Sequence, residues 1–219
     1  FATKNDLTGQ SSAKLKMNED LIKELDDYNN PKWDTLLNQM SLDEYVNFVC
    51  YAGFKTYYST SIGKPQTRDI DGPAGFNGAY STLPAIDEKW TSYPCETIIA
   101  CTYSKRLAFN LGCCLGAEAQ SEKVPVNGIY GPGANLHRSP FGSRNYEYFS
   151  EDRVLTGVMA SNEITGAKIN GLYMYMKHFV ADEMGYNPRN TTTWMTEQSL
   201  REEYCRPFEI AVKYGEANA

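Results

Sequence analysis

From residue 61 onward, the hydrophobic and polar positions alternate between short apolar runs and longer stretches of helical period. Short apolar runs bounded by turn residues predict strands, and apolar residues three and four apart predict helices. The runs predict about four strands, near 66–71, 97–102, 126–136 and 171–179, the last of them buried. Strands that alternate with helices indicate an α/β fold built on a parallel sheet.

Helices are expected between and after these strands. One ends near Glu122, and the last covers about 196–212. Another follows Ser150, a candidate N-cap, with Glu151 and Asp152 in its first turn. Negative charge there suits the positive end of the helix dipole, which supports this assignment.

Residues 1–60 are interpreted as a helical arm or outer layer, separate from the unit over 61–219. The segment MNEDLIKELDDY is amphipathic, and Pro31 ends it. Ser41 and Glu44 have the spacing of a capping box, which predicts that another helix starts there. No group with obvious chemistry lies in this arm.

Composition and charge limit the possible partners. Of 219 residues 42% are hydrophobic, enough for one sizeable core, and 21 basic against 27 acidic residues give a net charge of -6. Without a basic stripe to neutralise phosphates, nucleic acid is not an expected partner. No apolar run approaches the length of a bilayer span, so a membrane is not expected either.

The six cysteines form no Cys-x-x-Cys pair, and the chain has two histidines, so a zinc site has little support. Cys113 and Cys114 are adjacent in a helical pattern and point in different directions, which favours free thiols and a reducing, cytoplasmic location. Secretion is the alternative if the natural N-terminus lies upstream of Phe1, because the chain does not begin with Met.

One segment, YGPGANLHRSPFGSRNYEYFSED at 130–152, concentrates candidate chemistry. After a Gly-Pro-Gly turn it carries six closely spaced ionisable groups: His137, Arg138, Arg144, Glu147, Glu151 and Asp152. A loop after a strand is where an α/β scaffold places ligand-binding groups. A plain solvated loop is the alternative, disfavoured by the aromatic residues in the same segment. A nucleotide-binding loop is weaker still, because the third glycine of the dinucleotide fingerprint is missing.

Five segments in order resemble the barrel domain of glycoside hydrolase family 3, the β-glucosidase-like enzymes. They are RDIDGPAG (68–75), CTYSKRLAFNLGCCLGAEA (101–119), HRSPFGSRNYEYFSED (137–152), MKHF (176–179) and TEQSLREEYCRPFEIAVKYGEA (196–217). The resemblance implies a (β/α)8 TIM barrel, present here as roughly its first half, and a chemistry that uses no metal or cofactor. Half a barrel leaves strand edges open. The remaining barrel is therefore expected as a missing segment or a second chain, and the resemblance implies an α/β sandwich domain beside it.

The same resemblance implies a sugar site. It assigns the binding of sugar hydroxyls to Asp71, Arg138, Lys177 and His178. From the residues alone, Asp71 could instead form the turn before Gly72, Arg138 a structural ion pair, and His178 a satisfied core histidine. Adjacent strand residues point oppositely, so Lys177 and His178 can both contact a ligand only if the backbone bends there.

Arg144 and Glu147 are expected to form a pair that supports Arg138. Retaining glycosidases use a nucleophile and an acid/base carboxyl about 5 Å apart. The resemblance implies that both lie outside this chain, which would supply the sugar-binding half of the site.

Departures from the family pattern narrow the function. Ser143 replaces a usual Gly, and the acid expected in the run after Phe179 is Gly185 or has moved to Asp182 or Glu183. No Gly-His-Gly loop follows, which argues against a β-N-acetylglucosaminidase. We expect a retaining, exo-acting β-glucosidase-like or β-xylosidase-like enzyme acting on terminal non-reducing β-linked sugars. A catalytically inactive fragment, or a carbohydrate-binding or structural piece, is the alternative.

Overall fold

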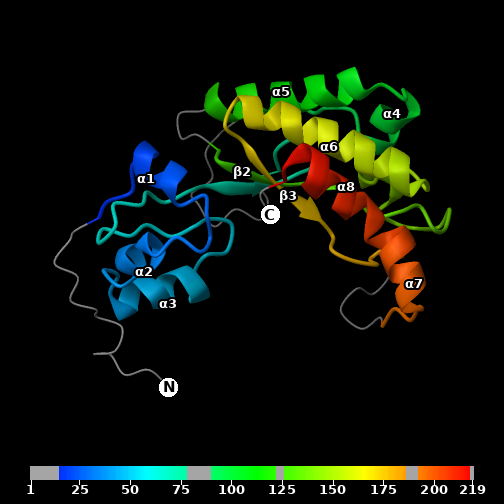
Figure 1. Cartoon of the computed structure of the whole chain (residues 1–219). Coiled ribbons are helices and arrows are strands. Elements are labelled where there is room, and N and C mark those ends of the chain that lie inside the picture. The colour runs from blue at the N-terminus through cyan, green and yellow to red at the C-terminus, as the bar shows by residue number, and fades with distance from the viewer. Residues whose placement is uncertain (1–14, 78–89, 122–125, 186–191, 218–219) are drawn as a thin grey trace. The chain divides into compact units, whose positions relative to one another are not determined.

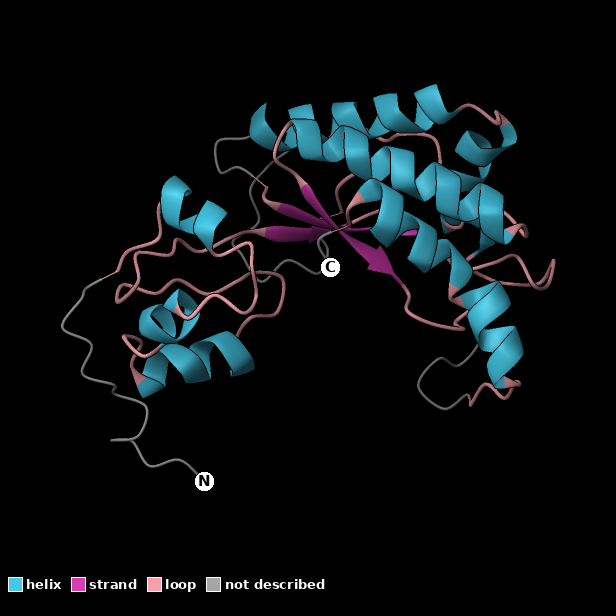
Figure 2. Ribbon diagram, in the orientation of Figure 1, coloured by secondary structure: helices cyan, strands magenta, loops and turns pink. Residues whose placement is uncertain are grey.

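A computed structural model describes residues 15–77, 90–121, 126–185 and 192–217 (Figures 1 and 2). The chain divides into two compact units between Arg68 and Asp69. None of the helices in these ranges is long and apolar enough to cross a bilayer.

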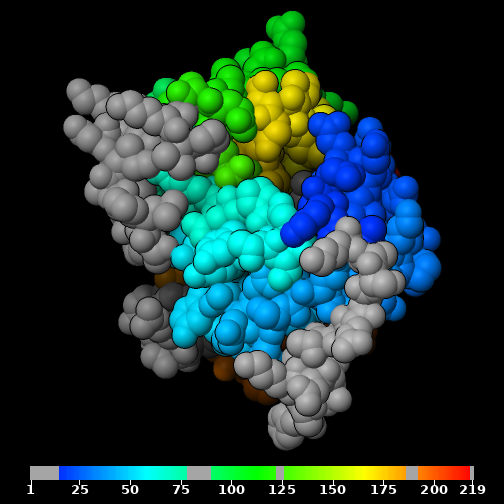
Figure 3. Space-filling view, turned by 90° about the vertical axis from the view of Figure 1, so that its left-hand side faces the viewer, coloured from blue at the N-terminus to red at the C-terminus, as the bar shows by residue number. Residues whose placement is uncertain are grey.

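The N-terminal unit contains three short helices, α1 (Glu19–Glu24), α2 (Lys32–Leu37) and α3 (Leu42–Cys50). Their apolar side chains share one small core, made by Leu21, Leu25, Leu36, Met40 and Ile62. Figure 3 shows α1 to α3, in blue, packed against the cyan segment that follows α3. The predicted helix over 17–28 is confirmed in a shorter form.

The capping box at α3 is confirmed. The Ser41 hydroxyl accepts from the Glu44 N–H, and the Glu44 carboxylate accepts from the Ser41 N–H. Glu44 also accepts from the Ser59 hydroxyl and the Ser61 N–H, at 2.8 and 3.0 Å. Although partial burial acts to raise the pKa of Glu44, these hydrogen bonds lower it to about 2. One carboxylate thus fixes both the helix start and the loop that folds over it.

The C-terminal unit is built on three parallel strands, β1 (Asp69–Asp71), β2 (Gly128–Gly133) and β3 (Tyr173–Lys177), in the order β1-β2-β3. Helices α4 (Glu96–Cys101) and α5 (Lys105–Ser121) connect β1 to β2, and α6 (Arg153–Ile169) connects β2 to β3. A 3-10 turn, η2 (Asn145–Glu147), precedes α6. After β3 come α7 (Glu197–Ser199), a π-helical turn (Leu200–Tyr204) and α8 (Arg206–Gly215).

Helices α5, α6 and α8 lie side by side over one face of the sheet (Figure 2). Ile70, Ile129 and Met174 point from the three strands into this helical layer and are at most 1% exposed. The alternate positions, including Tyr173, Tyr175 and Lys177, stay half-buried on the other face. The predicted buried strand over 171–179 is therefore buried on one face only, because the described helices pack on that face alone.

One expected strand and one expected N-cap were wrong. Residues 97–101 lie in helix α4 and Thr102 is its C-cap, so three strands are present among the described residues rather than four. In ETIIAC the buried positions are Glu96, Ile99 and Ala100, a helical spacing that a six-residue run shows poorly. At α6 the N-cap is Asp152, whose carboxylate accepts from the N–H groups of Val154 and Leu155. Ser150 lies outside the helix and accepts from the Asp152 N–H.

The helix predicted over 196–212 starts as expected at Thr196, whose hydroxyl accepts from the Ser199 N–H. It is nevertheless interrupted by the π-helical turn, where the Cys205 N–H bonds the Leu200 carbonyl. Pro207 then lies in the first turn of α8. Because proline has no N–H to donate, it is tolerated at a helix start and breaks a continuous helix.

Close contact between α5 and α6 depends on glycine. A Cβ on Gly112 would overlap the Glu163 carbonyl, and one on Gly166 would overlap the Phe109 carbonyl. Such contacts leave the backbone no room for a methyl group.

We predict that Gly166→Ala destabilises the protein by about 1 to 3 kcal/mol through this overlap. Gly53→Ala is the control, since a Cβ there meets nothing within 4 Å. Urea unfolding followed by far-UV circular dichroism measures both. Equal stability of Gly166→Ala and wild type would contradict the close packing.

Two carboxyl groups are buried between the helices. Glu96 is 1% and Glu163 0% exposed, and the described structure provides no hydrogen-bond partner for any of their four carboxyl oxygens. Burial raises the pKa of both groups, and the charge of Glu163 raises that of Glu96 further. Both are therefore more readily protonated in the folded than in the unfolded chain.

Carboxyl groups whose pKa is raised by folding favour the folded chain most at low pH. This contribution is lost as the pH rises towards their pKa in the folded chain. We predict that stability falls between about pH 5 and pH 8, and that Glu163→Gln, which cannot ionise, weakens this fall by up to about 1.4 kcal/mol per pH unit. Urea midpoints across this range provide the measurement, with the exposed Glu151→Gln as control. An unchanged pH dependence in Glu163→Gln would contradict the prediction.

Candidate functional site

A lysine ammonium group links the carboxyl ends of two strands. Lys177, the last residue of β3, donates to Asp71 Oδ1 at 2.7 Å and to the Gly72 carbonyl at 3.1 Å, both at the end of β1. Glu147 Oε2 lies 3.6 Å from the same Nζ. The lysine side chain is 14% exposed, so its charge depends on these oxygens rather than on water.

Glu147 is held in place by the turn η2. Its side chain is 4% exposed, and its Oε1 accepts from Arg144 Nε. The turn is bonded from two sides, because Thr97 Oγ1 of α4 and His137 Nε2 each contact the carbonyls of Asn145 and Tyr148 at 2.8 to 2.9 Å. Glu147 therefore connects two cations, Arg144 through one oxygen and Lys177 through the other.

His178 follows Lys177 across a cis peptide bond and joins the same network. Arg144 Nη2 lies 2.6 Å from His178 Nε2, and the Tyr148 hydroxyl lies 3.1 Å from Nδ1. A guanidinium group only donates, so Nε2 accepts and the ring proton is on Nδ1. The Tyr148 hydroxyl then accepts from Nδ1 and donates to the Asp182 carbonyl at 3.3 Å.

Burial lowers the pKa of His178 to about 3, and the nearby charges of Arg144 and Lys177 act in the same direction. The imidazole is therefore neutral at physiological pH. Burial raises the pKa of Tyr148, whose hydroxyl consequently stays protonated. The network carries its positive charge on Lys177 and Arg144 and its negative charge on carboxylates.

Asn135 holds the backbone of this strand end. It is 1% exposed, its Oδ1 accepts from the His178 N–H at 2.6 Å, and its Nδ2 donates to the His178 carbonyl at 3.0 Å and to Glu183 Oε1 at 3.3 Å. Neither Asn135 nor Tyr148 was predicted from the sequence as a site residue. A signal for Asn135 was available, because a polar residue two positions after β2 lies at the same sheet edge as the ends of β1 and β3.

The structure brings together Asp71, Lys177, His178, Arg144 and Glu147, but it does not bring Arg138 to them. Arg138 is exposed, and its guanidinium lies 5.8 Å from the centre of the Tyr204 ring. The expected Arg144–Glu147 pair exists, and its described contacts are with His178 and Lys177 rather than with Arg138. Asp71 also accepts from the Gly72 N–H at 3.0 Å, so a turn-forming role accompanies its contact with Lys177.

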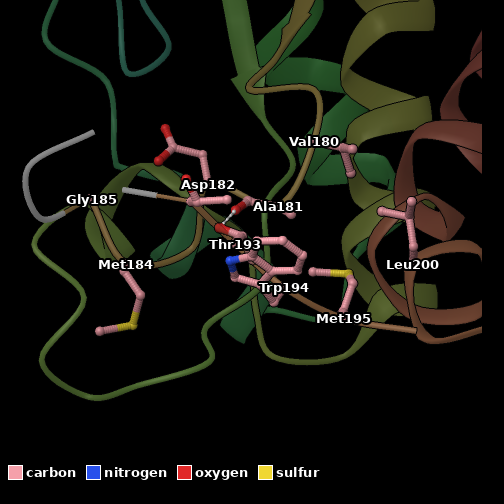
Figure 4. Close-up of a pocket in the computed structure, with 10 residues that line it drawn as sticks. Val180, Ala181, Asp182, Met184, Gly185, Thr193, Trp194, Met195 and Leu200 are labelled. Carbon is pink, nitrogen blue, oxygen red and sulfur yellow. Dashed lines mark hydrogen bonds between the residues drawn. The ribbon is translucent and has the colours of Figure 1, made fainter. Parts of the chain in front are cut away.

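A hollow of about 630 Å³ adjoins this network (Figure 4). It is lined by the segment after His178 and by residues just before α7, among them Trp194, whose side chain is 87% exposed. Asp182 belongs to both places, because it lines the hollow and lies 3.6 Å from Arg144 Nη1. The run at 181–189 departs from the family pattern, and its residues 186–189 lie outside the described part of the chain.

The chemical character of the site follows from its groups. Two carboxylates, two cations and a neutral imidazole offer donors and acceptors within one partly dry region, which suits a ligand rich in hydroxyl groups. Among the described residues, no three His, Cys, Asp or Glu side chains are arranged to hold a metal ion. The fold and site together define a parallel α/β protein with a polar site at the carboxyl ends of its strands, as in barrel enzymes.

Comparison with known proteins identifies the family. The family model described as "Glycosyl hydrolase family 3 N terminal domain" matches residues 82–218. The chain belongs to this family, as the motifs predicted. A putative β-glucosidase of Schizosaccharomyces pombe is 32% identical over 83% of this chain and 21% of its own length. A β-glucosidase of Ruminococcus albus is 39% identical over 72% of this chain and 16% of its own length.

Solved structures agree. β-Glucosidase 3B of Thermotoga neapolitana in complex with glucose has a TM-score of 0.73 and 33% identity, covering 84% of this chain and 28% of that one. A Kluyveromyces marxianus β-glucosidase in complex with glucose has a TM-score of 0.75 and 29% identity, covering 83% and 22%. The predicted partial TIM barrel is confirmed. The chain spans about a fifth of the length of the curated relatives it matches.

We predict that His178 remains in the neutral Nδ1–H form from about pH 5 to pH 8, because its pKa is lowered to about 3. Long-range ¹H–¹⁵N correlation spectra distinguish the two tautomers and the imidazolium. The chain has two histidines, so His137→Gln assigns the signals. A charged His178 near pH 5, or a dominant Nε2–H tautomer, would contradict the hydrogen-bond assignment.

Proposed function

We propose that the whole protein is a retaining, exo-acting β-glucosidase-like glycoside hydrolase that removes terminal non-reducing β-linked sugars. The observation that carries this proposal is the contact of Lys177 with Asp71 and Glu147 at the carboxyl ends of β1 and β3. The similarity to β-glucosidases solved with glucose supports glucose-type substrates. Xylosides remain the neighbouring substrate class.

In this proposal the chain supplies the sugar-binding half of the site. Asp71 accepts hydrogen bonds from two hydroxyls of the terminal sugar, and Lys177 donates to the same sugar. His178 and Arg144, which contact each other, bind the same sugar beside Asp71 and Lys177. The guanidinium carries five N–H donors, so its bonds to Glu147 and His178 leave others for a hydroxyl. Arg144 takes the position at the ring that the motif assigned to Arg138, which stays at the rim.

The nucleophile and the acid/base are proposed to come from outside these residues. A retaining reaction needs one carboxylate that attacks and one carboxyl that donates a proton. Asp71 and Glu147 are both bound to Lys177, which suits ligand binding rather than attack. The rest of the barrel and a sandwich domain are the proposed sources, as further chain or a second chain, and no cofactor is proposed.

A second candidate is a carbohydrate-binding protein without turnover. It is favoured because Lys177 lies beside both carboxylates, those of Asp71 and Glu147, and because the loop at 181–185 departs from the family pattern. Under this alternative the whole protein would bind glucose without hydrolysing aryl β-glucosides.

The six cysteines are free thiols. Free thiols suit a cytoplasmic location, which stays a prediction.

We predict that Asp71→Ala lowers kcat/KM for an aryl β-glucoside by at least about a hundredfold, because Lys177 loses a carboxylate partner and the sugar loses an acceptor. The assay uses the protein purified at its natural length. Glu202→Ala, an exposed carboxylate on the π-helical turn, is the control. Full activity of Asp71→Ala would overturn the proposed site, and glucose binding without turnover in wild type would select the second candidate.

A further inference from the structure

Tyrosines occupy the row of the sheet that contains Asp71. The strand register pairs Asp71 with Tyr130 of β2, and Tyr130 with Tyr175 of β3. Because side chains alternate along a strand, these three residues share one face with Lys177, two positions beyond Tyr175. Their sequence neighbours Ile70, Ile129 and Met174 point the other way, into the helical layer.

The two tyrosine rings form a stacked pair. Their centroids are 4.8 Å apart with an interplanar angle of 19°, and both side chains are half-buried. Aromatic area that remains accessible beside charged groups is costly to leave in water. The pair lies next to Asp71, the acceptor proposed for the sugar.

A buried carboxylate fixes the orientation of this pair. Asp69 is 1% exposed, and its oxygens accept from the hydroxyls of Tyr173 at 2.6 Å and Tyr175 at 3.0 Å. Asp69 precedes Asp71 by two residues on β1 and is therefore further from Lys177. The strand register pairs Asp69 with Gly128, and Gly128 with Tyr173. The Tyr175 hydroxyl is therefore drawn away from Lys177, and what remains beside Asp71 is ring rather than hydroxyl.

We propose that the stacked rings of Tyr130 and Tyr175 are the apolar floor of the sugar site. A pyranose with equatorial hydroxyls carries C–H groups on its faces and hydroxyls around its edge. One face would lie against the rings while the edge hydroxyls reach Asp71 and Lys177. Contact with the rings removes water, which strengthens the hydrogen bonds at the edge. This inference rests on the proposed function and adds the two residues that recognise the sugar's apolar face.

Tyr173 provides a matched control. It is on the same strand and the same face, packs at 5.3 Å from Tyr175 and shares the bond to Asp69, but it lies one row further from Asp71. Loss of its side chain therefore tests structural support, whereas loss of Tyr130 or Tyr175 tests support and sugar contact together.

The experiment measures the dissociation constant of glucose by calorimetry, and kcat and KM for an aryl β-glucoside, on the protein of natural length. We expect Tyr130→Leu and Tyr175→Leu to weaken glucose binding about three- to tenfold, mainly through KM. Tyr173→Leu should stay within about twofold of wild type.

Asp71→Ala, measured beside them, separates the possible failures. If it loses binding while Tyr130→Leu and Tyr175→Leu bind as wild type, the floor is overturned and the sugar site stands. If Asp71→Ala binds and hydrolyses normally, the proposed function itself fails. Equal losses in Tyr173→Leu and Tyr175→Leu would also overturn the floor, because they would indicate support alone.

A measurement on the wild type covers the case in which a leucine variant does not fold. With ¹³C-labelled tyrosine rings, bound glucose should show intermolecular nuclear Overhauser effects from ring protons to its C–H groups. Tyr175→Phe in the labelled protein should remove part of this signal. Glucose that binds without any such effect would overturn the floor.

Discussion

The site depends on one nearly buried ammonium group and the carboxylates around it. Lys177 joins β3 to β1 across the intervening β2, and through Glu147 it also reaches the turn before α6. A lysine so little exposed requires close negative partners, since an unpaired buried charge costs several kcal/mol. The positions of Asp71 and Glu147 are thus fixed by their contacts with one lysine.

The charges around this group are balanced in pairs. Arg144 is the second cation, and it contacts Glu147, Asp182 and the neutral ring of His178. Because the arginine donates to Nε2, it also determines which tautomer the imidazole adopts, and the Tyr148 hydroxyl completes the chain of donors. Removing one member therefore leaves a neighbour unsatisfied, so the network favours a single arrangement.

The two faces of the sheet have different tasks. Ile70, Ile129 and Met174 pack under α5, α6 and α8, where glycines allow the helices to approach closely. The opposite face carries Asp69, Asp71, the tyrosines and Lys177, a mixture that would be costly against another apolar layer. This division leaves the polar face free of the described helices. In the proposed enzyme, the remaining barrel strands close around it.

The sequence by itself determined the family, the partial barrel, the end of β1, and local signals such as the Ser41–Glu44 box. These depend on residues within one turn or on an ordered set of motifs. The sequence did not show whether 97–102 is strand or helix, since six apolar-rich residues fit the repeat of either element. Packing against the rest of the structure decides between them. Tertiary structure likewise decided that Arg144 contacts Glu147 and His178, whereas Arg138 lies beside Tyr204. This difference depends on the path of the chain after β2, which Thr97 sets by binding the Asn145 and Tyr148 carbonyls about fifty residues away in sequence. Contacts of that range bring the site residues together, and no local pattern records them.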